Sequence, residues 1–199
     1  MMTPEFWSIP ANTLTAAELS DKTATLKQGL LSIAEKFSDV RFATSLAAED
    51  MVITDAIAQS KAKIALFTLA TGRLHQETVD MTKATEDRYG ISITKAFPEE
   101  ADVQAFIDQY GMNGFYEGEE AKKACCGARK IKPLNAALIG ADAWLTGQRR
   151  EQSTTREELN FEEHDDARGI ASSIHYLIGL KPISGLTSNK KMYRFTRYI

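Results

Sequence analysis

The stretch K-I-A-L-F-T-L-A-T-G-R-L-H, residues 63–75, decides the fold. Its first six residues, 63–68, form a near-continuous apolar run, which is typical of a β-strand buried on both faces of a sheet. A polar, glycine-containing turn follows at Leu69–Leu74, and His75–Tyr89 then carries a helical pattern that Gly90 ends. A buried strand followed at once by a helix indicates an α/β protein.

The same alternation of strand and helix extends along the chain in both directions. Apolar spacing predicts helices over 16–37, 49–59, 75–89, a stretch opened by Pro98, and 119–138, the last broken near Pro133. Short β-prone runs predict strands over 40–44, 63–68, 91–94 and 143–146. We therefore predict one α/β domain, an open, mostly parallel sheet flanked by helices.

Composition limits the classes of function. The 199 residues are 43% hydrophobic, which suits one domain with a single core. The net charge is −3 and no block of lysine and arginine dominates, so we expect no nucleic-acid partner. No apolar run is long enough to span a bilayer, and Met1–Pro10 lacks the pattern of a signal peptide. We expect no membrane partner and a cytoplasmic location.

Three segments follow predicted strands and so lie at the carboxyl edge of the sheet, where ligands of open α/β sheets bind. They are Ser45–Asp50, Leu69–Leu74 and Gly147–Arg156. In the first, backbone N–H groups at a helix start and the Ser45 hydroxyl would face an oxyanion. The alternative is an ordinary capped turn. The glycines of the Walker-A and G-x-G-x-x-G loops are both absent.

The other two segments carry arginines beside glycines. Gly72 permits a backbone turn, and Arg73 suits phosphate or sulfate. Gly147 allows close backbone approach to a ligand, and arginines follow it at Arg149, Arg150 and Arg156. Arginine matches the oxygens of phosphate and sulfate, although solvated loops neutralised by nearby glutamates remain the alternative.

The two cysteines of the chain, Cys125 and Cys126, are adjacent. A disulfide between neighbours is strained and closes no useful loop, so the pair is interpreted as metal-binding or redox-active. In a helix, Cys126 and Lys130 would share one face, which places an ammonium near a thiolate. An iron–sulfur cluster normally needs four cysteines. Either a second copy of the chain completes such a site or the remaining ligands are missing.

In this order, the segments resemble the assimilatory adenylyl-sulfate (APS) and phosphoadenylyl-sulfate (PAPS) reductases, from about residue 30 to residue 171. The family's usual motifs are S-F-G-A-E-D, L-D-T-G-R-L-H-P-E-T and I-T-G-L-R-R-D-Q-S-x-T-R. Here they are S-L-A-A-E-D, L-A-T-G-R-L-H-Q-E-T and L-T-G-Q-R-R-E-Q-S-T-T-R. Adjacent cysteines before R-K-x-x-P-L mark the APS branch.

The resemblance implies an adenine-nucleotide α-hydrolase-like fold and the reduction of APS to sulfite and AMP. A C-terminal cysteine would attack the substrate's sulfur, and thioredoxin would release sulfite. A [4Fe–4S] cluster, with Cys125 and Cys126 as two of its four ligands, would assist electrostatically. Arg129 and Lys130 would lie between cluster and substrate. The nucleotide and sulfate site would comprise Ser45, Leu69, Gly72, Arg73, Gly147, Arg149 and Arg150.

Two departures from the family pattern stand out. Ala70 replaces the aspartate of L-D-T-G. After Ala171 the family continues K-F-N-P-L and ends with further cysteines, whereas this chain continues S-S-I-H-Y. A one-base shift near codon 172 would restore the family continuation, and Gly179 and Gly185 supply the G-G pairs that its tryptophan codons require. We expect residues 1–171 to form an incomplete reductase domain and residues 172–199 to be out of frame, poorly ordered and without the catalytic cysteine.

Two alternatives of different class remain open. One is another α-hydrolase-type enzyme, including a PAPS reductase, although S-L-A-A-E-D is not the S-G-G-x-D-S loop of the sulfurtransferases and adenylating ligases. The other is a non-catalytic adenine-nucleotide-binding protein that uses the cysteine pair as a sensor. A homo-oligomer is possible, because two chains could share one cluster.

Overall fold

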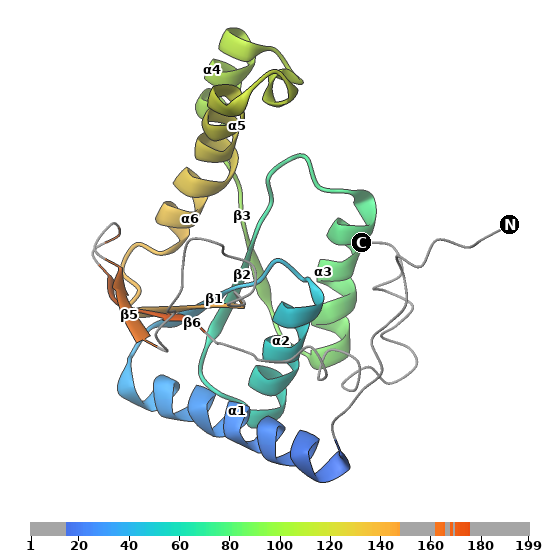
Figure 1. The fold of residues 1–199 in the computed structure, drawn as a ribbon, viewed down its shortest axis with the longest axis vertical. Helices are drawn as coiled ribbons and strands as arrows, with labels where there is room; N and C mark the ends of the chain where they lie inside the picture. Colours follow the sequence, from blue (N-terminus) through green and yellow to red (C-terminus); the bar gives the residue numbers. More distant parts are fainter. Residues whose placement is uncertain (1–14, 148–161, 166–167, 169, 176–199) are drawn as a thin grey trace, which may run out of the picture.

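The computed structural model describes residues 15–147, 162–165, 168 and 170–175 (Figure 1). The described helices are α1 (Ala16–Lys36), α2 (Ala48–Ser60), α3 (Gln76–Tyr89), α4 (Glu100–Tyr110), η2 (Gly114–Tyr116), α5 (Glu119–Cys126), η3 (Gly127–Ile131) and α6 (Lys132–Ala137). The strands are β1 (Val40–Ala43), β2 (Ala65–Leu69), β3 (Ile93–Ala96), β4 (Ala143–Thr146), β5 (Glu162–Asp165) and β6 (Ile170–His175).

The strands form one sheet in the order β3-β2-β1-β4-β6-β5. Every neighbouring pair is parallel except β5, which runs antiparallel to β6. The expected open, mostly parallel sheet flanked by helices is confirmed. The sequence pattern contained no indication of β5 and β6. Strand β6 crosses the boundary at residue 171, and Ser172–His175 pair with β4. The change of reading frame stays a prediction, and residues 176–199 lie outside the described part of the chain.

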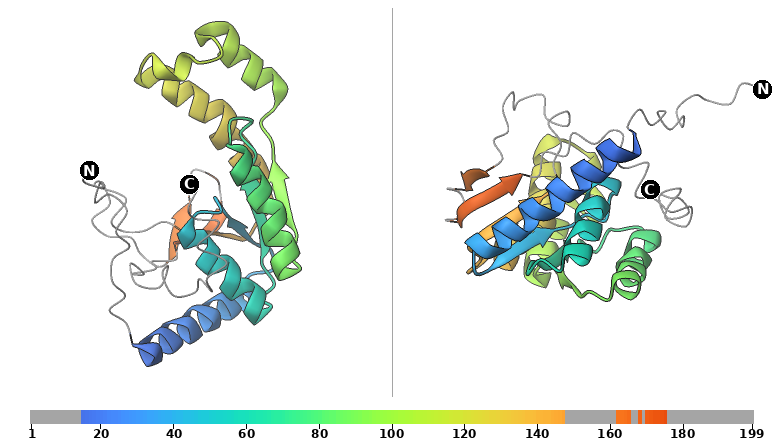
Figure 2. Two further views of the ribbon diagram at one scale, coloured as in Figure 1. Left: turned by 90° about the vertical axis from the view of Figure 1, so that its right-hand side faces the viewer. Right: turned by 90° about the horizontal axis from the view of Figure 1, so that it is seen from below.

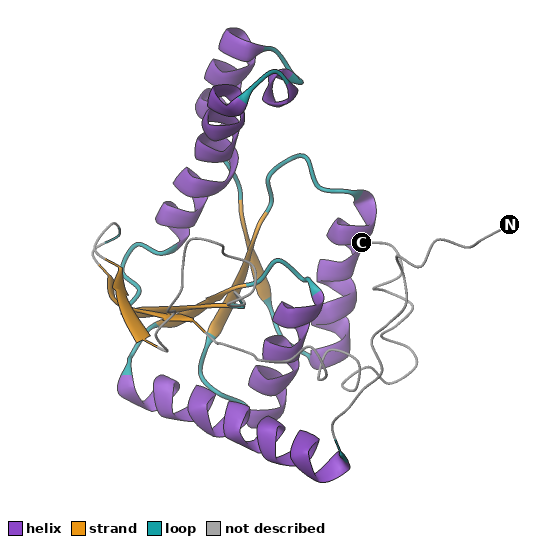
Figure 3. Cartoon of the chain, viewed as in Figure 1, coloured by secondary structure: helices purple, strands orange, loops and turns teal. Residues whose placement is uncertain are grey.

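Helices cover both faces of the sheet (Figures 2 and 3). Because successive side chains of a strand point to opposite faces, Leu66 and Phe67 enter different cores. The larger core joins the strands to α1, α2 and α3 and contains Phe42 and Leu145, both fully buried. The smaller core packs Phe67 and Trp144 against Leu134, Ala137 and Leu138, at and just after α6. The prediction that the central strands are buried on both faces of the sheet is therefore confirmed.

Local chemistry explains where the helices begin and end. Thr15 and Glu18 form a reciprocal capping box that starts α1, and Leu26, Leu30 and Ile33 then bury one face of that helix. Gly90 takes a left-handed conformation and ends α3 by donating its N–H to the carbonyl of Glu86 at 2.8 Å. None of the described helices is both long and apolar enough to cross a membrane.

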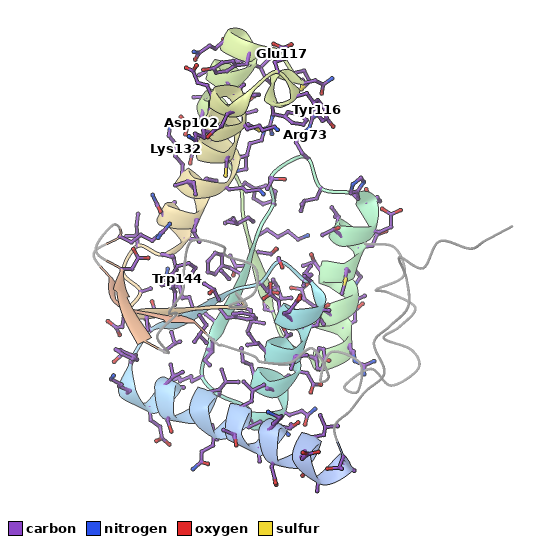
Figure 4. All side chains as sticks on the ribbon, in the orientation of Figure 1. Arg73, Asp102, Tyr116, Glu117, Lys132 and Trp144 are labelled. Atoms are coloured by element: carbon purple, nitrogen blue, oxygen red, sulfur yellow. The ribbon has the colours of Figure 1, made fainter. Side chains whose placement is uncertain are left out.

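Residues 100–137, from α4 to α6, form a helical arm that begins beyond the carboxyl end of β3 and projects away from the sheet (Figures 1 and 2). The arm carries its own ion pair between Lys132 and Asp102, labelled in Figure 4. Instead of the predicted break near Pro133, the helix continues through a π-helix at Gly127–Ile131 into α6, and Pro133 lies in the first turn of α6.

Candidate functional site

A cavity of about 230 Å³ opens at the carboxyl edge of the sheet. We call it the edge cavity. Its walls come from the turn after β1, the end of β2 and the turn after it, the start of α3, and the arm. They include Ser45, Leu69, Thr71, Leu74, Thr78 and Lys130. Parallel strands end at the same edge, which is why segments distant in sequence meet here. Of the residues expected to bind the nucleotide, Ser45 and Leu69 line this cavity.

Ser45 makes its closest contacts with Asp50, in the first turn of α2. The Ser45 N–H donates to Asp50 Oδ2 at 2.6 Å, and the Ser45 hydroxyl donates to the same oxygen. The hydroxyl also accepts the N–H of Ala47 at 3.3 Å. Asp50 is buried, and burial raises the pKa of its carboxyl above the ordinary value, while the two bonds from Ser45 act in the opposite direction. The proton of the Ser45 hydroxyl is therefore engaged within the protein.

The turn between Ser45 and α2 holds a strained residue. Leu46 has φ of 62°, in the left-handed region that side chains other than glycine rarely adopt. Its side chain is fully buried in the larger core, and its N–H donates to Thr44 Oγ1 at 3.1 Å. Strain of this kind persists only where the surroundings determine it, and it gathers at ligand sites. The turn therefore has a defined shape before any ligand binds.

The second predicted segment turns at Gly72, which has φ of 72°. A glycine tolerates this conformation without cost, so its predicted role as a turn residue is confirmed. Arg73 follows and points toward the arm (Figure 4). Its Nη2 donates to Asn113 Oδ1 at 2.7 Å, and its guanidinium lies 4.9 Å from the centre of the Phe115 ring. Arg73 does not line the edge cavity.

A second cavity, of about 210 Å³, adjoins the first. We call it the thiol cavity. It is lined by Thr71, Arg73, Phe115, Lys122, Cys125, Cys126, Arg129 and Lys130. Thr71 and Lys130 line both cavities. Arg129 is buried, and its Nη1 donates to the carbonyl of Thr71 at 2.9 Å, which joins the arm to the turn after β2. The structure thus brings both cysteines, Arg129 and Lys130 together, as the resemblance implies.

The residues of the thiol cavity supply part of what an anionic group bound by thiolates requires. Both cysteines are half-buried free thiols, and four cationic side chains surround them. Positive surroundings stabilise thiolates and clusters of negative charge. Within the described residues, no group of three or more His, Cys, Asp or Glu side chains gathers as a metal site. The donor set is therefore half of the four thiolates that a [4Fe–4S] cluster requires.

The helix that carries the cysteines differs from the expected one. Cys125 and Cys126 end α5, and the π-helix Gly127–Ile131 follows directly. A π-helix closes its hydrogen bonds one residue later than an α-helix, so four residues still make close to one turn. Cys126 and Lys130 both line the thiol cavity. Single turns of π-helix inside α-helices are frequent at functional sites.

The third predicted segment is described only at its start. Gly147 follows β4 and packs on the Asp50 carboxylate. Arg149 and Arg150 lie outside the described residues, so their predicted role remains untested. Sequence reasoning assigned no individual role to Asp50 and Thr71, which lie in the first two predicted segments, and it missed Lys122 and Phe115. Lys122 belongs to the basic run around the cysteines, which was the available signal for it.

Fold and site together define an α/β domain with one cavity at its carboxyl edge and, beside it, a second cavity lined by two thiols and four cationic side chains. Residues 39–197 match the family model "Phosphoadenosine phosphosulfate reductase domain". The chain belongs to this family.

Similar proteins of known name point to the same family. The chain is 49% identical over 154 residues to the adenosine 5'-phosphosulfate reductase of Burkholderia cepacia, covering 77% of this chain and 62% of that protein. It is 49% identical over 169 residues to the enzyme of the same name from Neisseria meningitidis serogroup A, covering 84% and 69% respectively. The chain thus spans about two thirds of the length of these relatives.

A solved structure shares the fold. The crystal structure of the phosphoadenylyl-sulfate reductase from Candida auris, a phosphate complex, superposes with a TM-score of 0.60 at 20% sequence identity. The match covers 93% of this chain and 87% of the other. The expected adenine-nucleotide α-hydrolase-like fold is confirmed.

Proposed function

We propose that this chain binds adenylyl sulfate in the edge cavity and is the nucleotide-binding part of an enzyme that reduces it to sulfite and AMP. One observation carries the proposal: Thr71 and Lys130 line both the edge cavity and the thiol cavity. An anion held in the first therefore adjoins the cysteine pair in the second. The family and the names of the 49% identical relatives support the same substrate.

The charges suit a sulfate and phosphate ligand. The exposed side chain of Lys130 brings a cation to the edge cavity, and α2 directs its N-terminus to the same edge. Because the proton of Ser45 is engaged by Asp50, we propose that Ser45 shapes the wall of the site and that backbone N–H groups at the start of α2 meet the anion. We further propose that Arg149 and Arg150, which follow Gly147, contribute the remaining positive charge.

The proposed reaction transfers two electrons to sulfur. A thiolate attacks the sulfur of adenylyl sulfate, the bond to AMP breaks, and AMP leaves with the bonding electrons. One thiolate of reduced thioredoxin attacks the cysteine sulfur of the resulting thiosulfonate, which releases sulfite and forms a mixed disulfide; the second thiol of thioredoxin then displaces the enzyme's thiolate and leaves oxidised thioredoxin. The two cysteines of this sequence both line the thiol cavity. We therefore assign nucleotide binding to the chain as given, and turnover to a chain in which codon 172 onward is read in the family's frame.

We assign Cys125 and Cys126 as two ligands of a [4Fe–4S] cluster, with the other two supplied by the reframed C-terminal segment or a second copy of the chain. When bound, such a group supplies an electrostatic influence on the sulfate. Arg129 and Lys130 are the cations between it and the substrate. A reductant such as thioredoxin implies a reducing compartment, and we propose the cytoplasm.

Titration calorimetry with adenylyl sulfate and phosphoadenylyl sulfate tests the substrate. We expect the first to bind more tightly, whereas tighter binding of the second would favour a phosphoadenylyl-sulfate reductase. Iron and acid-labile sulfide analysis of the reframed protein tests the cluster. Sulfide and iron present together, and lost when Cys126 is changed to Ser, support the assignment. Nucleotide binding with no iron would instead indicate a thiol sensor.

A further inference from the structure

One carboxylate contacts the residues that follow two neighbouring strands, β1 and β4. Asp50 Oδ2 accepts both the N–H and the hydroxyl of Ser45, which belongs to the turn after β1. Asp50 Oδ1 lies against Gly147, the residue that follows β4. Asp50 itself is only 6% exposed, and the described residues leave no buried side-chain polar atom without a partner. We call Ser45, Asp50 and Gly147 the loop junction.

The contact with Gly147 is steric. A Cβ built on Gly147 would lie 1.9 Å from Asp50 Oδ1 and 3.1 Å from its carboxyl carbon. Non-bonded atoms never approach so closely, so a side chain at position 147 requires the carboxylate to move. Gly147 does not have the left-handed backbone that glycine alone favours, since the positive-φ glycines are Gly72, Gly90, Gly111 and Gly140. A glycine is needed here because Asp50 occupies the space.

The hydrogen bonds from Ser45 to Asp50 help to hold a strained backbone conformation at the next residue. The residue after Ser45, Leu46, is left-handed at φ of 62°. A turn with such strain relaxes unless both sides are fixed. Core burial fixes Leu46, the hydroxyl of Thr44 accepts its N–H at 3.1 Å, and Asp50 accepts the N–H of the preceding residue, Ser45. Without Asp50, the N–H and hydroxyl of Ser45 lose their common acceptor.

We propose that Asp50 is a positioning residue of the nucleotide site: its carboxylate holds the turn after β1 in its anion-binding shape and sets the distance from that turn to Gly147 at the end of β4. The inference rests on the proposed function of the edge cavity. Asp50 acts through Ser45 and Gly147 and touches no ligand. An anionic side chain beside an anion site would by itself weaken binding of a nucleotide, so its presence is explained by the two loops that it joins.

The first experiment measures AMP binding by titration calorimetry, with thermal unfolding of each variant in parallel. Asp50→Asn keeps one oxygen acceptor for Ser45 and removes the charge. We expect it to weaken AMP binding by about tenfold, and Asp50→Ala to weaken it further. Asp55→Asn, on the same helix and away from the cavity, is the matched control and should leave binding unchanged. Equal or tighter binding in Asp50→Asn overturns the proposal, because removal of a merely repulsive charge gives that result.

The second experiment is a double-mutant cycle between Asp50 and Gly147. Gly147→Ala alone should weaken AMP binding by about tenfold and lower the unfolding temperature, since its methyl group meets the carboxylate. In the Asp50→Ala background the same change should cost about twofold or less, because the obstructing oxygens are gone. Additive penalties, in binding or in unfolding temperature, overturn the proposal.

These experiments distinguish failure of the proposed function of the edge cavity from failure of the positioning role of Asp50. If the wild-type protein does not bind AMP, the proposed function of the edge cavity fails, and with it any role of Asp50 in binding. If the wild type binds AMP and the variants bind equally well, only the positioning role fails. Ser45→Ala separates the contributions of the N–H and the hydroxyl: we expect an effect no larger than that of Asp50→Asn, and a larger effect contradicts action through Asp50.

Discussion

The carboxyl edge of the sheet and the helical arm hold their functional groups in different ways. At the edge, a buried carboxylate joins two loops over a core that includes Phe42 and Leu145. The arm is joined to the edge by Arg129, which donates to the carbonyl of Thr71, and by Arg73, which donates to Asn113. The base of the arm packs in the smaller core, whereas beside the thiol cavity the arm is joined to the edge by two guanidinium groups. We therefore expect changes at these guanidinium groups to alter the thiol cavity without unfolding the sheet.

The largest expected effect is on the core. Phe42 is fully buried in the central strand. Phe42→Ala should lower the free energy of unfolding by about 3–5 kcal/mol, the usual result of deleting a buried aromatic ring. Guanidinium chloride unfolding measures it. Tyr116→Ala, at a residue of the arm that is 77% exposed, is the control and should change the same quantity by less than about 0.5 kcal/mol. Similar losses for both would remove the distinction between the two regions.

Arg129 should have the next largest effect, and it should be confined to the arm. Arg129→Ala leaves the carbonyl of Thr71 without its donor, which costs about 1–3 kcal/mol for a buried group. The rate at which iodoacetamide alkylates Cys125 and Cys126 should rise, because the joint beside the thiol cavity opens. Lys83→Ala, on the exposed face of α3, is the control. Unchanged alkylation with a folded variant would show that Arg129 does not hold the arm.

The edge should also show a distinctive pH dependence. Burial raises the pKa of Asp50 above its ordinary value of 3.8, so the folded state favours the protonated form. That contribution to stability is fully present below pH 3.8 and is lost as the pH rises through the raised pKa of the folded state. Urea unfolding at several pH values should therefore show the wild type losing stability relative to Asp50→Asn as pH rises. A relative gain with rising pH would mean that the hydrogen bonds from Ser45 outweigh burial.

The smallest expected effect belongs to Arg73. It is exposed, and it contacts Asn113 through a side-chain hydrogen bond, the carbonyl of Met112 at 3.4 Å and the face of the Phe115 ring. Arg73→Gln should reduce the free energy of unfolding by about 0.5–1 kcal/mol, with a modest rise in cysteine alkylation. Thermal unfolding measures the change in the free energy of unfolding. A loss comparable to that of Phe42→Ala would place Arg73 among the residues that hold the fold.

Sequence pattern predicts the regions that packing determines. The strand at Ala65–Leu69 was predictable, because a strand covered on both faces must be apolar along its length. Strands β5 and β6 were not, since E-E-H-D and I-A-S-S-I-H show no such run and their pairing is made by backbone groups. The π-helix was not predictable either, because apolar spacing does not report hydrogen-bond register. Gly127 within a helical pattern was the local signal.

The site was predictable in its positions and not in its contacts. Three strand ends at one edge placed Ser45 and Leu69 correctly, because parallel topology brings them together. The direction of Arg73 depends on where the arm lies, which no local pattern gives. Asp50 has the appearance of an ordinary acidic residue at a helix start. Its role depends on Gly147, which is distant in sequence and adjacent only in the fold.

The central claim is that one wall, containing Lys130, serves both cavities. Titration calorimetry of adenylyl sulfate on the wild type and on Lys130→Ala tests it most directly, with Lys83→Ala as the matched lysine control. We predict that Lys130→Ala weakens binding by about tenfold or more, because a charge-assisted contact to the anion is lost, while Lys83→Ala binds like the wild type. Equal affinity of Lys130→Ala and wild type, with all three proteins folded, would contradict it.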